Sequence, residues 1–191
     1  TGSAATVSPG GGGGACVVAD FLASSLGTTQ TVTIGAGGAR IVSPTTATGN
    51  IGGDTTFGSI LTAHAGSAYN VGGSVLDGIT ENATNGGESV YAASQATPSP
   101  KASVYAGGTP SSDGSQDSPP SVYGGAAGGS VSSAAAARLG GASLFGGDGG
   151  AGSSAGNGVD GAQPGGGGGA TQTGTQSGKG GDGEVHFWGI V

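Results

Sequence analysis

Hydrophobic and polar residues alternate in four short segments near the two ends of the chain. These segments are 15–22, 29–34, 55–61 and 184–191. A period of two is typical of half-buried β-strands, because successive side chains of a strand point to opposite faces. We expect the first two segments to form an antiparallel hairpin. The last one is apolar enough to need a partner strand, and the hairpin is the natural one.

A period of three dominates the segment 140–169. Counted in steps of three from Gly140, one set of positions carries glycine at seven of ten places, the next at six and the last at two. The last set carries Ala142, Phe145, Asp148, Ala151, Ser154, Asn157, Asp160 and Gln163. A polyproline-II helix has three residues per turn and no internal hydrogen bonds. We therefore predict rods with two bare glycine faces, which bond to neighbouring backbones, and one face of side chains.

The glycine phase breaks at 165–169, and glycines after Ala170 fall on a new phase. We expect one or more rods in 140–164, a turn or phase change at 165–169, and a later rod in 174–183. The predicted fold class is irregular and β, with essentially no α-helix. Polyglycine-II helices would pack on a small antiparallel sheet made by the N-terminal hairpin and the C-terminal strand. The whole chain, 1–191, is expected to form a single glycine-rich domain.

The middle of the chain, 67–123, lacks this regularity and is rich in serine, proline and tyrosine. It contains three repeats of serine, valine, tyrosine and a small residue, at 89–92, 103–106 and 121–124. We interpret each repeat as a short extended rung and the pieces between them as displayed loops. Residues 15–66 and 124–191 are then the scaffold, and 67–123 is a variable loop insertion.

Composition and charge narrow the function classes. Glycine supplies 48 of 191 residues and only 8% of residues are charged, so a charged disordered coil is not expected. The net charge is −7, and the scattered basic residues are Arg40, Lys101, Arg138 and Lys179. Without a basic patch, no nucleic-acid partner is expected. No apolar run reaches about 18 residues, so no membrane insertion is expected. We interpret Asp148, Asp160 and Asp182 as solvent-facing positions on the rods.

The residues that carry most enzyme chemistry are scarce. The two histidines, His64 and His186, stand in different segments, and Cys16 is alone, which excludes a disulfide within the chain. We interpret Cys16 as a small buried apolar residue and His186 as a packing or surface position, and neither histidine is expected to act as a general base or metal ligand. The segment 146–154 is similar to a calcium-binding nonapeptide repeat but has Ala151 at the required aspartate. The chain is therefore not expected to be an enzyme or to hold a metal or cofactor.

Four motifs together point to a family. In chain order they are VTIGAGG at 32–38, GGDTTFGS at 52–59, GGASLFG at 140–146 and GKGGDGEVHFW at 178–188. They resemble the glycine-rich domains of bacteriophage tail-fibre and tail-tip proteins, over roughly 15–66 and 124–191. The resemblance implies a sandwich of packed polyglycine-II helices whose tip loops bind the host receptor.

The resemblance implies a non-enzymatic receptor-binding domain on the virion, outside the cell. Its partners would be other tail or virion proteins and a host-surface glycan or outer-membrane protein; a homotrimer and a monomer both stay open. The loop residues expected to bind the receptor are Tyr91, Pro98, Pro100, Lys101, Tyr105, Pro110, Asp113, Asp117, Pro119 and Tyr123. The tyrosines have an alternative role as packing anchors. Deletion of 93–102 and 108–120 is expected to leave the fold intact and abolish adsorption.

Two other functions are compatible with the sequence. The first is a purely structural virion component, such as a capsid or tail decoration or a fibre-coupling domain, that has no receptor. The second is a secreted or cell-wall glycine-rich protein of a cellular organism. Such proteins tend to be uniform repeats, and the strand motifs at both ends of this chain argue against that class.

Overall fold

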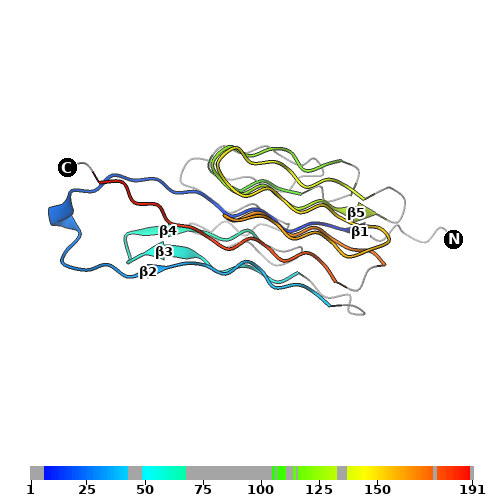
Figure 1. The fold of residues 1–191 in the computed structure, drawn as a ribbon, viewed down its shortest axis with the longest axis horizontal. Coiled ribbons are helices and arrows are strands. Elements are labelled where there is room, and N and C mark those ends of the chain that lie inside the picture. The colour runs from blue at the N-terminus through cyan, green and yellow to red at the C-terminus, as the bar shows by residue number, and fades with distance from the viewer. Residues whose placement is uncertain are drawn as a thin grey trace, which may run out of the picture.

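The chain runs back and forth along one long axis as extended segments joined by turns (Figure 1). The computed structural model describes residues 7–42, 49–67, 105, 107–110, 114, 116–132, 137–173 and 176–189. Its labelled elements are β1 (Val7–Ser8), the 3-10 helix η1 (Ala23–Ser25), β2 (Val32–Thr33), β3 (Thr55–Phe57), β4 (Leu61–Ala63) and β5 (Val131–Ser132). These residues contain no α-helix, which confirms the predicted fold class, and no helix among them is long and apolar enough to cross a membrane.

The extended segments are rods that bond to one another at every third residue. The N–H of Gly129 donates to Gly150 O, the N–H of Gly150 donates to Gly167 O, and the N–H of Ala170 donates back to Gly129 O, at 2.8, 2.9 and 3.0 Å. Three residues earlier the circuit recurs, from Ala126 to Gly147, from Gly147 to Pro164 and from Gly167 to Ala126. A step of three residues without bonds inside the rod is the geometry of a polyproline-II-type helix. The predicted rods are therefore present.

Close approach of backbones makes glycine necessary on the inner faces of the rods. A Cβ built on Gly150 would lie 1.9 Å from Val159 O, and one on Gly13 would lie 1.9 Å from Gly125 O. The predicted side-chain face points outward, because seven of its eight non-glycine residues are exposed and Ala151 is half-buried. The buried apolar side chains of the described residues are small: Ala126, Ala127, Val131 and Ala170. Backbone hydrogen bonds therefore take the place of a large apolar core.

The five-glycine run is mostly a rod rather than a turn. The chain turns at 163–165, where Gly165 adopts a left-handed φ of 74°, and the rest of the run continues as a rod. Its glycines face four different neighbours: an added Cβ would meet Asp148 O at Gly166, Gly11 O at Gly167, Gly178 O at Gly168 and Ala151 O at Gly169. A rod without side chains on any face is the one that other rods can surround completely. The turn expected in this run is therefore limited to its first residue, Gly165, where the turn 163–165 ends.

The sheet differs from the prediction in its strands. It has the order β2-β3-β4, antiparallel, with Val32 opposite Phe57 and Phe57 opposite Leu61. Segment 15–22 forms no strand, and neither does 184–189 within the described part of the C-terminal segment. The alternation in 15–22 does not correspond to a burial pattern, because residues 18–22 are all exposed, and Ala15 and Cys16 donate backbone hydrogen bonds to His64 O and Tyr105 O. In the C-terminal segment, Phe187 packs on Phe57 with ring centroids 5.3 Å apart. A second pair, β1 with β5, lies at the opposite end of the rods (Figure 1).

Parts of the predicted loop insertion belong to the rod bundle. Gly108 donates its N–H to Gly125 O and accepts at its carbonyl from Gly13 N, and Thr109 and Pro110 are fully buried. The repeat at 121–124 is a turn and not an extended rung. Deletion of 108–120 would therefore remove packed backbone, and the expectation that it leaves the fold intact is wrong.

The solvent-facing aspartates also hold neighbouring rods together. Asp160 Oδ1 accepts the Lys179 N–H at 2.7 Å, and Asp182 Oδ1 accepts the Gly37 N–H at 2.8 Å. Asp160 also pairs with Arg40, and Asp182 pairs with the Lys179 ammonium at 2.8 Å. These carboxylates satisfy N–H groups at the outside of the bundle, where no further rod supplies a carbonyl.

We predict that Gly150→Ala destabilises the domain strongly. The new methyl group would overlap Val159 O, a backbone atom that cannot move without breaking the rods apart. The expected loss is about 3 kcal/mol, at the upper end of overpacking, or roughly 6–12 °C in Tm. Thermal unfolding followed by circular dichroism measures it. Gly189→Ala is the control, because nothing lies within 4 Å of its added Cβ; equal Tm values for the two variants would contradict the packing described above.

We predict an acid-sensitive contribution from Asp182. The hydrogen bond from the Lys179 ammonium, followed by the one from Gly37 N–H, holds the pKa of this carboxyl below its ordinary value of 3.8. Because the pKa is lower in the folded chain, the stabilisation is present above pH 3.8 and is lost as the pH falls through the folded-state pKa. Tm measured from pH ~6 to ~2.5 should fall more steeply for the wild type than for Asp182→Asn, which keeps an acceptor oxygen. Parallel curves of Tm against pH for the two proteins would contradict the stabilising role of the Asp182 charge.

Candidate binding groove

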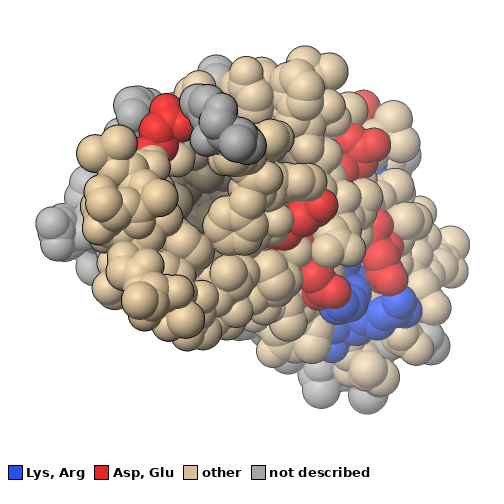
Figure 2. Space-filling model, turned by 60° about the vertical axis from the view of Figure 1, so that its left-hand side comes forward, with Lys and Arg blue, Asp and Glu red and all other residues tan. Residues whose placement is uncertain are grey.

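An open groove of about 1860 Å³ follows the rods and opens at their turns. Its lining runs from Ser8 of β1 and Pro9 to Tyr123 and Phe145 in the rod turns. Beyond the turns it is bounded by parts of a lobe made by residues 15–34, 55–63 and 184–189, which we call the strand lobe. The strand lobe extends beyond the rod turns at the end of the molecule opposite β1 and β5 (Figure 1). Viewed towards that end, the surface is hollowed (Figure 2).

Serine hydroxyl groups shape the turns that form one wall. In the turn 143–146, Ser143 Oγ accepts the Gly146 N–H at 2.9 Å and donates to Gly124 O at 2.8 Å. In the turn 121–124, Ser121 Oγ donates to Gly124 O at 2.7 Å. The Phe145 N–H donates to Val122 O at 2.9 Å, which places the two turns side by side. The residue before the glycine of each turn is aromatic, so the two rings are brought into register.

The aligned turns build a ladder of three stacked rings, which we call the aromatic ladder. Tyr105 and Tyr123 have centroids 5.0 Å apart at 13°, and Tyr123 and Phe145 have centroids 5.1 Å apart at 10°. Tyr105 is half-buried, Tyr123 is 39% exposed and Phe145 is 63% exposed. Exposure therefore rises along the ladder towards Phe145.

The opposite wall is apolar as well. Phe57 of β3 contacts Phe21 at 6.5 Å and Phe187 at 5.3 Å between ring centroids. Trp188 stacks on His186 at 5.8 Å and is 81% exposed, and Leu22 is 77% exposed. The groove thus lies between two groups of aromatic rings contributed by distant parts of the sequence.

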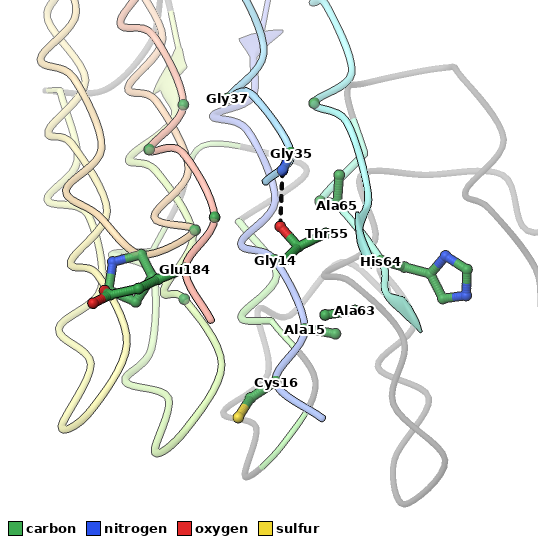
Figure 3. A pocket seen from close by; sticks show the side chains of 18 of the residues that line it. Gly14, Ala15, Cys16, Gly35, Gly37, Thr55, Ala63, His64, Ala65 and Glu184 are labelled. Carbon is green, nitrogen blue, oxygen red and sulfur yellow. Dashed lines mark hydrogen bonds between the residues drawn. The ribbon is translucent and has the colours of Figure 1, made fainter. Parts of the chain in front are cut away.

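Several polar groups of the groove are paired with neighbouring groups. Thr55 Oγ1 accepts the Gly35 N–H at 3.0 Å, and Figure 3 shows the His64 ring directed away from Cys16 and Glu184. His64 Nδ1 instead lies 3.0 Å from an Asp54 carboxylate oxygen. Burial raises the pKa of the Cys16 thiol, which keeps it protonated and weakly nucleophilic at neutral pH. Within the described ranges, His, Cys, Asp and Glu side chains form no group of three suited to a metal ion.

Among the described residues that line the groove there is no Lys or Arg, whereas Asp20 and Glu184 are present. Arg40 and Lys179 stand next to lining residues in the chain but are not part of the lining. Arg40 and Lys179 pair with Asp160 and Asp182 on the rods, and the space-filling view shows basic surface mainly as one area beside acidic residues (Figure 2).

The structure separates the predicted receptor-binding residues into different environments. Tyr105 and Tyr123 come together in the aromatic ladder, and so act at least as packing partners of each other. Pro110 is fully buried between rods and is not available to a receptor. Asp117 is exposed, but its Oδ1 accepts the Leu139 N–H at 2.9 Å; Pro119 is half-buried. The remaining predictions lie outside the described residues: Tyr91, Pro98, Pro100, Lys101 and Asp113.

Phe145 is not among the residues predicted from the sequence to bind the receptor, although the sequence carries a signal for it. The segment SLFG at 143–146 repeats SVYG at 121–124, with serine, an apolar residue, an aromatic ring and glycine in the same order. If the two segments had been read as turns, both rings would have been predicted to lie at one end of the rods.

Comparison with known proteins identifies a family. A family model described as a glycine-rich domain matches residues 1–188. Neither a curated protein nor a solved structure matches the chain.

We predict that Ser143→Ala disturbs the aromatic ladder. It removes the acceptor of the Gly146 N–H and the donor to Gly124 O, each bond being worth about 0.5–1.5 kcal/mol. Tm should fall and the near-ultraviolet circular dichroism of the stacked tyrosines should weaken. Ser154→Ala, at an exposed position of another turn, is the control and should change neither signal. An unaltered near-ultraviolet spectrum in Ser143→Ala would refute the role assigned to this hydroxyl.

Proposed function

The chain belongs to the glycine-rich domain family, and we propose that it is a non-enzymatic tip domain of a bacteriophage tail fibre. In this role it attaches the virion to the surface of a host cell. The observation that carries the proposal is the groove at the rod ends, which places the aromatic ladder and the apolar strand lobe around one open space.

The rods supply the rigidity that attachment needs. Backbone hydrogen bonds join each rod to several neighbours, so the turns that carry Tyr123 and Phe145 are held by bonds to more than one neighbouring rod. A binding site ordered in advance loses little conformational entropy when a receptor binds. Several copies on one virion would then convert weak single contacts into firm attachment through avidity.

A structural role in the virion is the second candidate, and a specific observation favours it. The strand lobe exposes several large apolar side chains, among them Val18, Leu22 and Trp188. Surface of this kind is typical of contacts with another protein. As a capsid or tail decoration or a fibre-coupling domain, the chain would bury this lobe against virion proteins and meet no receptor.

The test uses the chain's single cysteine. Cys16 lines the groove, so a bulky maleimide on its thiol would obstruct the space between the two walls. The full chain, carrying a fluorescent protein before residue 1, is incubated with a panel of bacterial strains, and bound fluorescence is counted by flow cytometry. Labelling at pH about 8.5 allows for the raised pKa of the thiol.

We expect the unmodified chain to bind a subset of strains, and the maleimide adduct to lose at least about tenfold of that binding, a loss of about 1.4 kcal/mol. Cys16→Ala treated with the same reagent is the matched control and should bind normally; circular dichroism checks that the adduct stays folded. Equal binding by the adduct would exclude attachment through the groove. Binding to purified tail proteins but to no strain would favour the structural role.

A further inference from the structure

The aromatic ladder leaves one ring face open at its exposed end. Tyr123 is covered on both sides, by Tyr105 and by Phe145. Phe145 stacks on Tyr123 alone among the rings of the described residues, and it is 63% exposed. The stack therefore ends on a flat apolar surface at the edge of the groove, the size of a single six-membered ring.

The chemistry of this surface favours a sugar ring. The face of an aromatic ring is electron-rich and attracts groups with weak positive charge. One face of a hexose carries several C–H groups of that kind, while its hydroxyl groups at the rim stay free for hydrogen bonds. Glu184 and His186 line the same groove, 2.9 Å apart, and offer polar atoms to such hydroxyls. A single free ring face suits a ligand made of ring-sized units better than a broad protein surface.

Charge restricts the ligand further. No Lys or Arg is found among the described residues that line the groove, and the carboxylates of Asp20 and Glu184 lie there. Phosphate, sulfate or uronate groups would meet like charges without a basic partner. Anionic polysaccharides and phosphorylated lipid headgroups are therefore disfavoured.

We propose that the groove binds an uncharged, hexose-containing glycan of the host surface, with one sugar ring stacked on the free face of Phe145. This inference rests on the proposed attachment function and names its receptor class. Phe145 then determines affinity directly, and Tyr105 and Tyr123 act as positioning residues that hold its ring in place.

The test measures binding of defined oligosaccharides to the full chain by saturation-transfer NMR and by titration of tyrosine fluorescence. The uncharged probes are maltohexaose, cellohexaose, mannohexaose and chitohexaose, and the charged counterparts are oligomers of alginate and polygalacturonate. We expect binding of at least one uncharged probe and of neither charged one. Phe145→Ala should weaken that binding about two- to tenfold, the effect of losing one aromatic stacking partner.

Two further variants separate stacking from a general effect on the turn. Phe145→Tyr keeps the ring face and should bind like the wild type. Leu144→Ala alters the neighbouring residue, which is 71% exposed and is not among the groove residues, and should also bind normally. Equal weakening by Leu144→Ala and Phe145→Ala would overturn the assignment to Phe145.

The possible outcomes show whether the receptor-class inference or the proposed attachment function has failed. If the chain binds cells through the groove but binds no uncharged probe, and protease treatment of the cells removes binding, the receptor is a protein and the glycan inference fails alone. If uncharged probes bind but no strain does, the ligand class stands and the attachment function fails. If only charged oligomers bind, the charge argument is wrong and the inference is overturned.

Discussion

Backbone hydrogen bonding between rods is the interaction on which the rest of this structure depends. The described residues bury only small apolar side chains, so burial of apolar area cannot by itself offset the entropy of ordering so many glycines. The bonds recur at every third residue, at 2.7–3.0 Å in the circuits that link the rods at Gly129, Gly150 and Gly167. They form only because the inner faces lack a Cβ, as the 1.9 Å approach at Gly150 illustrates. The high glycine content and the dense bonding between rods therefore have one cause: backbones approach this closely only where no Cβ stands between them.

This constraint also determines where chemistry can be displayed. The interior of the described bundle has room only for small side chains such as Ala126 and Val131, so the larger ones collect on the outward face of each rod and in the turns at the rod ends. Outward aspartates such as Asp160 and Asp182 serve the scaffold by accepting N–H groups of neighbouring rods. In the turns, serine hydroxyl groups bond to the backbone, and parallel bonding between two turns stacks their aromatic residues into the ladder. The exposed aromatic surface at the rod turns therefore follows from the same geometry that holds the rods together.

Attachment and virion structure compete as roles for the same end of the molecule. The aromatic ladder and the strand lobe face each other across the groove, and the lobe exposes Leu22 and Trp188. An adhesin would leave this end free at the tip of a fibre, whereas a coupling domain would cover it. The two roles therefore differ in what lies against one surface and not in the fold that presents it.

The sequence by itself determined the rods and their outward face, because a period of three in glycine is a local property with one structural explanation. Its alternation also placed strands at β2 and β3, but the single strand expected at 55–61 turns at 58–60 and returns as β4. It did not determine the partners: segments 15–22 and 184–189 alternate like strands but form none, and a period of two contains no information on what lies alongside. Only the tertiary structure brought Tyr105, Tyr123 and Phe145 together and buried Pro110. Those outcomes depend on which rods are neighbours, a choice made by hydrogen bonds between residues far apart in the chain.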